Sequence, residues 1–238
     1  MKLAKQFIDV GLFTNNVDAM RAFYAERVRL PFEEILPVGP GLKQHRFGML
    51  GSVLKLNASR DAVPPRQPGG YRRLVIADPN TSTPTKLQDP DGNDIELVPV
   101  GERGIRQIEI QLDVTDEADF ERFYGAALQG RKLGAGRFQI GDTIVSFAKD
   151  AAATRAPQAA SASPMDVIGA MRAVGIRYIT IQVRNCDEEH NRFIAMGVQE
   201  GAAPVTLGEL ARISFIRDPD GNFIEISQRA SLTGPLPH

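Results

Sequence analysis

The chain has 238 residues, 42% hydrophobic and 24% charged, which is typical of a globular protein with a sizeable core. Its formal net charge of -1 excludes the basic surface that nucleic-acid binding requires, and no apolar run reaches membrane-spanning length. The first residues lack the apolar stretch of a secretion signal, and the single cysteine, Cys186, has no partner for an internal disulfide. We therefore expect a cytoplasmic protein that binds neither nucleic acid nor membranes.

Four segments alternate between polar and apolar residues with the period of two that is typical of strands. In chain order these segments are 7–13, 71–76, 107–114 and 178–183. The alternation is clearest at 107–114, where Gln107, Glu109 and Gln111 share one face, and weakest at 71–76. A strand of this kind covers an apolar layer with one face and leaves the other face in polar surroundings.

Helices are predicted after three of these four strands. Asn16, Asp116 and Asn185 stand where helix N-caps are expected, and apolar residues follow each of them at helical spacing. Short strands are predicted after the helices, at 32–37, 45–49, 52–57, 132–139, 142–148, 212–217 and 223–228. Too little chain follows 71–76 for a helix, so the second of the four units is predicted to be shortened.

The pentapeptide DPDGN occurs twice, at 89–93 and at 218–222, and is followed in each case by a residue and then Ile-Glu. Its proline, glycine and asparagine are typical of a tight hairpin turn. Each copy places a glutamate, Glu96 or Glu225, just after the turn. The repeat predicts two tandem domains, at 1–100 and 104–230. An Ala/Ser/Pro-biased linker is predicted inside the second domain, at 151–164.

The opening strand and helix of each half, at 7–28 and 108–128, resemble those of the vicinal oxygen chelate superfamily, including a Phe-Tyr pair on the helix. The two DPDGN segments resemble its closing hairpin. The resemblance covers most of 5–229 and implies an α+β fold, with tandem paired βαβββ units forming two half-barrel, glyoxalase-like domains. Function stays open, because the superfamily includes glyoxalase I, extradiol dioxygenases, epimerases, fosfomycin resistance enzymes and metal-free drug-binding proteins.

In that superfamily, paired units curl around a metal whose ligands come from the first and last strand of each unit. The resemblance places these residues at the ligand positions: Asp9, Lys55, Tyr71 and Glu96 in the first half, and Glu109, Ser146, Tyr178 and Glu225 in the second. None of them is histidine, whereas a non-haem iron dioxygenase requires two imidazoles and a carboxylate. An extradiol dioxygenase is therefore disfavoured.

In the first half, Lys55 is expected to lie near Asp9 and Glu96 and to supply the positive charge that a metal would otherwise supply. We therefore expect no metal at this site. A substrate-binding role is predicted for the residues at these and neighbouring polar positions, namely Asp9, Lys55, Tyr71, Glu96, Ser146 and Gln111.

In the second half, Glu109 and Glu225 are expected to approach one another beside Tyr178. Three outcomes are open: the two carboxylates bind a divalent metal ion, they share a proton, or an arginine such as Arg212 neutralises them. Sharing a proton would provide a general base, and Tyr178 would then donate a hydrogen bond to the oxyanion that develops. Glu225, Glu109 and Tyr178 are thus the predicted catalytic residues, and Glu109 and Glu225 the predicted metal ligands.

The leading hypothesis is a glyoxalase-like enzyme that transfers a proton on a small carbonyl compound, as an isomerase or lyase, with its site in the C-terminal half. The alternative is a metal-free protein that sequesters a small molecule without turnover, as bleomycin resistance proteins do. A module with vestigial pockets is the third option.

The pairing of the four units is also open. Units pair either within each half or by a swap of the first with the fourth, which would bring Asp9 and Lys55 to Tyr178 and Glu225. The protein is expected to be a monomer built as an internal pseudo-dimer, or a homodimer.

Overall fold

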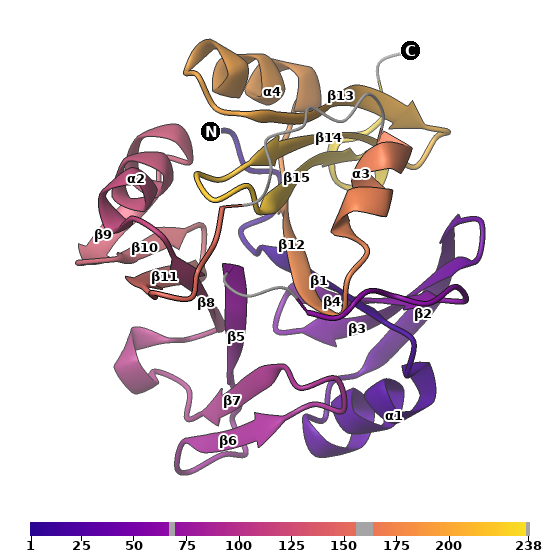
Figure 1. Ribbon diagram of the computed structural model, residues 1–238, viewed down its shortest axis with the longest axis vertical. Helices are drawn as coiled ribbons and strands as arrows, with labels where there is room; N and C mark the ends of the chain where they lie inside the picture. The colour runs from indigo at the N-terminus through magenta and orange to yellow at the C-terminus, as the bar shows by residue number, and fades with distance from the viewer. Residues whose placement is uncertain (67–69, 156–163, 237–238) are drawn as a thin grey trace.

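The computed structural model describes residues 1–66, 70–155 and 164–236 and has an α+β fold with two mixed sheets (Figure 1). The eight-stranded sheet has the order β13-β14-β15-β12-β1-β4-β3-β2. Its strands are β1 (Asp9–Thr14), β2 (Phe32–Gly39), β3 (Leu42–Met49), β4 (Ser52–Ser59), β12 (Gly175–Gln182), β13 (Glu200–Leu207), β14 (Ala211–Arg217) and β15 (Phe223–Arg229).

The seven-stranded sheet has the order β6-β7-β5-β8-β11-β10-β9. Its strands are β5 (Gly70–Ala77), β6 (Thr85–Gln88), β7 (Asp94–Val98), β8 (Ile108–Val114), β9 (Arg131–Gly134), β10 (Arg137–Ile140) and β11 (Thr143–Lys149). All four segments with period-two alternation are strands, as predicted. The segment predicted as one strand at 132–139 is instead a hairpin of β9 and β10, which turns at Gly136 with a φ of 59°.

The three predicted helices occur in the predicted order, and within the described ranges three further helical segments were not predicted. They are α1 (Val17–Ala22) with a π-helical turn η1 (Phe23–Arg27), η2 (Glu102–Gly104), α2 (Glu117–Arg122) with a second π-helical turn η3 (Phe123–Ala127), α3 (Pro164–Met171), α4 (Cys186–Ala195) and α5 (Ala230–Thr233). Asp116 and Asn185 cap α2 and α4 with their side chains, whereas Asn16 makes no such bond. Among the described residues no helix lies between β5 and β6, which confirms the shortened second unit.

The segment predicted as a linker, 151–164, falls mostly on 156–163, which lie outside the described residues. Its last residue begins α3, a helix that the composition did not indicate. In the part of the chain that the structure describes, no helix is both long and apolar enough to cross a membrane.

The four units pair across the two halves of the chain. β1 of the first unit lies antiparallel to β12 of the fourth, and β5 of the second lies antiparallel to β8 of the third. Within each unit the first and last strands are parallel neighbours, as in β1 with β4 and β12 with β15. The swapped arrangement is therefore the one adopted, and the sequence halves 1–100 and 104–230 each contribute to both sheets.

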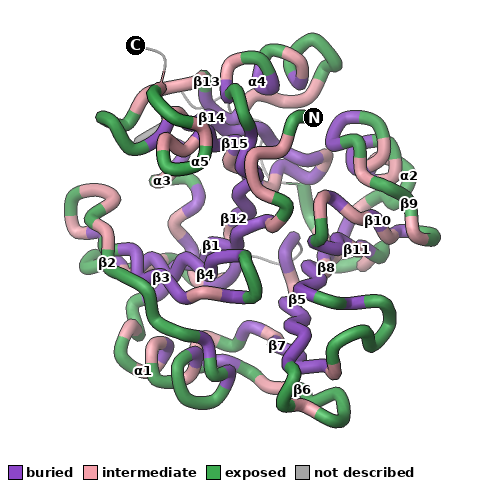
Figure 2. Tube along the Cα trace, turned by 180° about the vertical axis from the view of Figure 1, so that it is seen from behind, coloured by how far each residue is buried: buried purple, intermediate pink, exposed green. Residues whose placement is uncertain are grey.

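One hydrophobic core joins the two sheets (Figure 2). It includes the apolar faces of β1 and β8 and the fully buried Tyr24 and Tyr124 of the two π-helical turns. Polar bonds also connect the sheets: Tyr71 Oη donates to the carbonyl oxygen of Phe223 at 3.0 Å, at a position with 3% exposure. Tyr71, predicted as a substrate-binding residue, is thus occupied in holding β5 against β15.

The two DPDGN turns have the same internal hydrogen bonds. Asp89 Oδ1 accepts from the backbone N–H groups of Asp91 and Asn93, and Asp218 Oδ1 accepts from those of Asp220 and Asn222. The surroundings of the two copies differ: Tyr24 donates a 2.8 Å hydrogen bond to Asp89, whereas Tyr124 Oη has no hydrogen-bond partner among the described residues. The turns are therefore architectural, but their buried aspartates have different surroundings.

We predict that Asp218 makes the protein less stable as the pH rises from about 4 to about 7. Burial raises the pKa of Asp218 to about 7, although hydrogen bonds from Asn222 oppose the shift. The folded state then binds a proton that the unfolded chain releases near its ordinary pKa of about 3.9, so folding loses roughly 1.4 kcal/mol for each pH unit in that window. Urea unfolding of wild type and Asp218→Asn at pH 5 and pH 8 measures this slope. The variant should show a flatter dependence, and equal slopes would contradict the assignment.

Candidate functional site

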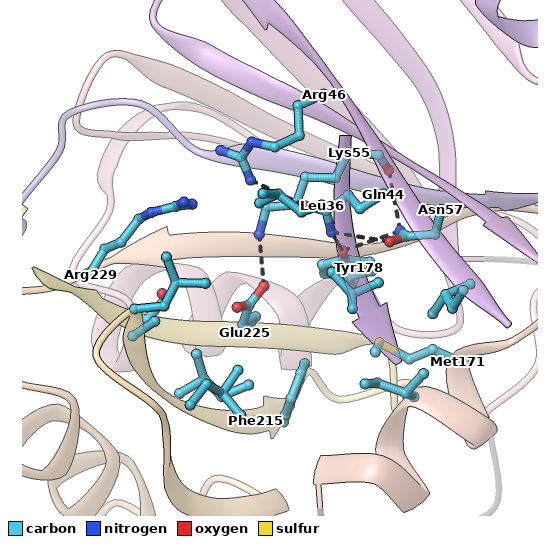
Figure 3. Close-up of a pocket in the computed structure, with 18 of the residues that line it drawn as sticks. Leu36, Gln44, Arg46, Lys55, Asn57, Met171, Tyr178, Phe215, Glu225 and Arg229 are labelled. Atoms are coloured by element: carbon cyan, nitrogen blue, oxygen red, sulfur yellow. Dashed lines mark hydrogen bonds and ion pairs between the residues drawn. The ribbon is translucent and has the colours of Figure 1, made fainter. Parts of the chain in front are cut away.

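A cavity of ≈ 310 Å³ lies against the inner face of the eight-stranded sheet, with α3 at its side (Figure 3). Most of its wall is apolar, and the sheet also presents a patch of polar side chains to it. The apolar wall includes Phe13, Leu36, Ile168, Met171, Leu210 and Phe215. The polar patch consists of Gln44, Arg46, Lys55, Asn57, Tyr178, Gln182, Glu225, Ser227 and Arg229. Apolar walls with few polar groups are typical of small-molecule sites.

Lys55 and Glu225 line this cavity and form a closed hydrogen-bonded triad with the buried Thr180. Lys55 Nζ donates to Thr180 Oγ1 at 2.6 Å and to Glu225 Oε2 at 2.9 Å, and Thr180 Oγ1 donates to the same carboxylate oxygen at 2.6 Å. Strand register causes this meeting, because Gly11 of β1 lies between Lys55 and Tyr178, and Thr180 lies beside Glu225. The ammonium group thus supplies the positive charge beside Glu225.

The charges around Lys55 keep it protonated. Burial lowers the pKa of Lys55, but the negative charge of Glu225 and the further contributions of Tyr178 and Asp9 outweigh burial, so that the net shift is upward. Lys55 therefore acts in this cavity as a fixed cation and not as a base.

Tyr178 is held over the sheet by two amides. Its hydroxyl oxygen accepts from Asn57 Nδ2 at 3.3 Å and from Gln44 Nε2 at 3.4 Å, while Lys55 Nζ lies 5.5 Å from the ring centroid. Burial raises the pKa of Tyr178, with Lys55 opposing the shift, so the phenol keeps its proton at neutral pH. Because both amides donate to the oxygen, the phenol proton is available to a ligand in the cavity.

Glu225 has one carboxylate oxygen engaged and one open. Both hydrogen bonds to Glu225 reach Oε2, and Oε1 accepts none from the described residues. The residue lines the cavity together with Tyr178. The site thus presents an oriented acceptor and a donor to the same space, which is the pair of groups that proton transfer next to a carbonyl requires.

Four further predicted site residues, Glu109, Glu96, Ser146 and Gln111, lie in the seven-stranded sheet. Glu109 in β8 accepts from Arg137 Nε at 3.0 Å, and Glu96 in β7 accepts from Arg103 Nη2 at 3.0 Å. Ser146 and Gln111 are half-buried neighbours on β11 and β8. Glu109 is therefore separated from Glu225 and Tyr178, since β8 pairs with β5 and not with β12.

A metal ion held by Glu109 and Glu225, one of the three outcomes left open, does not fit these contacts. Glu109 and Glu225 belong to different sheets, and each carboxylate is paired with its own cation, Arg137 or Lys55. Among the described residues no group of three or more His, Cys, Asp or Glu side chains could hold a metal ion. The ammonium of Lys55 lies beside Glu225 at 2.9 Å, where it already supplies a positive charge.

Lys55 does not pair with Asp9 or Glu96, as expected for pairing within the first half, but with Glu225, as expected for the swapped pairing. Asp9 accepts from Lys5 Nζ and from the backbone N–H of Val53, at 2.7 and 2.8 Å, while Lys55 turns to Glu225. The cavity is consequently lined by residues from both halves of the chain, and not from the C-terminal half alone. Arg212, named as a possible neutralising group, instead pairs with Asp187.

Several cavity residues were not among the predicted site residues. Gln44 and Arg46 on β3, and Asn57 on β4, face the cavity with Lys55. Asn57 follows Lys55 by two positions, so strand alternation would have placed it on the same face. Arg229 likewise lies two residues beyond Ser227 at the end of β15. No strand alternation or sequence motif indicated that residues of α3 would line the cavity.

The sequence is similar to that of a known protein family, and the fold to those of known proteins. A family model described as Glyoxalase/Bleomycin resistance protein/Dioxygenase superfamily matches residues 108–226, half of the chain. Glyoxalase I from Zea mays superposes with a TM-score of 0.66 at 14% identity, covering 95% of this chain and 92% of the maize chain. A candidate dioxygenase from Bacillus subtilis superposes with a TM-score of 0.67 at 16% identity, covering 96% and 86%. No curated protein matches the sequence. At these identities the likeness to solved structures establishes the fold alone.

Proposed function

Because the chain belongs to the glyoxalase/bleomycin resistance protein/dioxygenase superfamily, we propose that it is an enzyme that transfers a proton on a small carbonyl compound. The observation that carries this proposal is the arrangement of Glu225 and Tyr178, whose free acceptor and free donor face one cavity. The reaction class is an isomerisation or lyase-type step, and its site is the cavity of the eight-stranded sheet.

In this proposal Glu225 acts as the base. Its Oε1 removes a proton from the carbon next to the carbonyl group, and the electron pair of that C–H bond moves to the carbonyl oxygen as an enolate forms. Tyr178 donates a hydrogen bond to the enolate oxygen, and Glu225 then returns the proton to the same or the neighbouring carbon. Thr180 and Lys55 hold Oε2 and so fix the direction of Oε1.

We expect Glu225→Gln to slow this proton transfer by at least about 100-fold, because the amide cannot accept the proton. The measurement is exchange of C–H protons in D₂O, followed by ¹H NMR, for hydroxyacetone, 2-oxobutanoate and related small carbonyl compounds. Tyr178→Phe should slow exchange by roughly 100-fold through loss of one oxyanion donor. Circular dichroism verifies that both variants are folded.

The variant Glu109→Gln tests which of the two sheets carries the residues that catalyse proton exchange. Glu109, the other predicted catalytic carboxylate, lies in the seven-stranded sheet, and its replacement should leave exchange at the wild-type rate if the chemistry belongs to Glu225. Loss of exchange in Glu109→Gln but not in Glu225→Gln would move the site to the other sheet. Absence of exchange for every compound tested would count against an enzyme of this class.

A second candidate is binding without turnover, which two features favour. Glu225 is already paired with the ammonium of Lys55, and most of the cavity wall is apolar. A protein of this kind would retain a ligand through purification, and native mass spectrometry followed by extraction would recover that ligand unchanged. Glu225→Gln would still retain it, whereas an enzyme would release product.

A further inference from the structure

A second cavity of ≈ 290 Å³ adjoins the first and has a different chemical character. The two cavities share Arg46, Gln182 and Arg229 as lining residues. The rest of the second cavity is mostly charged, with Lys5, Asp9, Glu34, Ser231 and Leu232. An apolar cavity thus adjoins a charged one, and Arg46 and Arg229 lie at the junction as part of both walls.

The charges of the two cavities do not balance. Three carboxylates each have a cationic partner: Asp9 with Lys5 at 2.7 Å, Glu34 with Arg46 at 3.2 Å, and Glu225 with Lys55 at 2.9 Å. The side chain of the fourth cation, Arg229, has no hydrogen bond or ion pair with any described residue, and it reaches toward Arg46 (Figure 3). One positive charge is therefore left for a ligand.

The surroundings of Arg229 make this charge costly without a ligand. Arg229 is half-buried, and burial followed by the nearby charge of Arg46 lowers its pKa, against the attraction of Glu34, Asp9 and Glu225. A partly desolvated guanidinium beside another one gains most from an anion that accepts two parallel hydrogen bonds. A carboxylate has this geometry.

We propose that the junction of the two cavities is a binding site for an organic acid, with its carboxylate on Arg229 and its apolar part in the first cavity. This assignment rests on the proposed function in one respect: if Glu225 is the base, its substrate is a carbonyl compound that also carries a carboxylate. The ion pair with Arg229 does not require turnover. Binding and catalysis can therefore be tested separately.

The test compares hexanoate with its uncharged counterpart hexanamide, by titration of the full chain followed in ¹H–¹⁵N NMR spectra. Hexanoate should bind about tenfold more tightly than hexanamide to the wild type, with shifts at residues of the first cavity. Arg229→Gln should remove this preference and leave the weak binding of hexanamide unchanged, while Arg229→Lys should retain part of it. Arg60→Gln is the control, since Arg60 pairs with Asp61 and its side chain is 76% exposed.

Equal binding of the two compounds to the wild type would overturn the proposal, as would an undiminished preference in Arg229→Gln. Failure of hexanoate to bind at all would also overturn it. A preference for hexanoate without proton exchange in the D₂O assay would leave the binding site standing and reject only the catalytic step.

Discussion

Replacing Lys55 with methionine is expected to lower the free energy of unfolding by about 3–5 kcal/mol. The side chains of Lys55 and Glu225 are only 6% and 12% exposed, so the variant leaves a largely buried carboxylate without a cation. Thr180 also loses the donor to its hydroxyl oxygen. Removing one partner of a buried pair costs more than the pair contributes, because the desolvated charge remains. Urea denaturation, monitored by circular dichroism, measures the change.

The double variant Lys55→Met/Glu225→Leu separates the effect of an unpaired buried charge on stability from the effect of altered packing. It removes both ions, and we expect it to recover most of the lost free energy of unfolding, since apolar replacements of buried pairs are often neutral. Lys2→Met is the matched surface control: Lys2 pairs with Glu188, with side chains 67% and 51% exposed, and its loss should cost less than about 1 kcal/mol. A Lys55→Met variant as stable as Lys2→Met would show that water screens the pair.

The strands and helices could be predicted because their signals are local. Alternation at 107–114 and 178–183 and the caps at Asp116 and Asn185 depend only on neighbouring residues, and the structure has strands and helices there. The tandem repeat with its shortened second unit was also visible in the sequence. Alternation states which face of a strand is buried, but not which strand lies beside it.

The predicted approach of Glu109 to Glu225 and Tyr178 was wrong for that reason, whereas the swapped alternative brought Lys55 to them. Glu109 and Asp9 both lie on opening strands with similar patterns, and either could have been the neighbour of Tyr178. The structure pairs β12 with β1, so Glu225 meets Lys55 from the far end of the sequence. The helix α3 was missed because it follows an Ala/Ser-rich stretch, although a proline at its first position is a known start signal.

Gly11→Ala tests this pairing directly and is the second substitution with a large expected effect. A Cβ atom at Gly11 would lie 2.0 Å from Tyr178 Cε1 and 2.1 Å from Cζ, far inside contact distance. The tyrosine ring covers β1 at this point and its hydroxyl bonds to Gln44 and Asn57, so it has little freedom to move aside. We expect the variant to lose about 1–3 kcal/mol of stability from overpacking.

The same substitution should also disable the cavity, because a displaced Tyr178 ring enters it and its hydroxyl leaves the position beside Glu225. Gly134→Ala in β9 is the matched control, since its Cβ meets nothing within 4 Å. Adding Tyr178→Val to Gly11→Ala removes the obstructing ring and should restore part of the stability but not the proton exchange. If the units paired within each half of the chain, Gly11 and Tyr178 would be apart, and alanine at position 11 would be tolerated as well as at position 134. The stability of Gly11→Ala, measured by urea unfolding, thus decides between the two topologies that the repeated sequence leaves open.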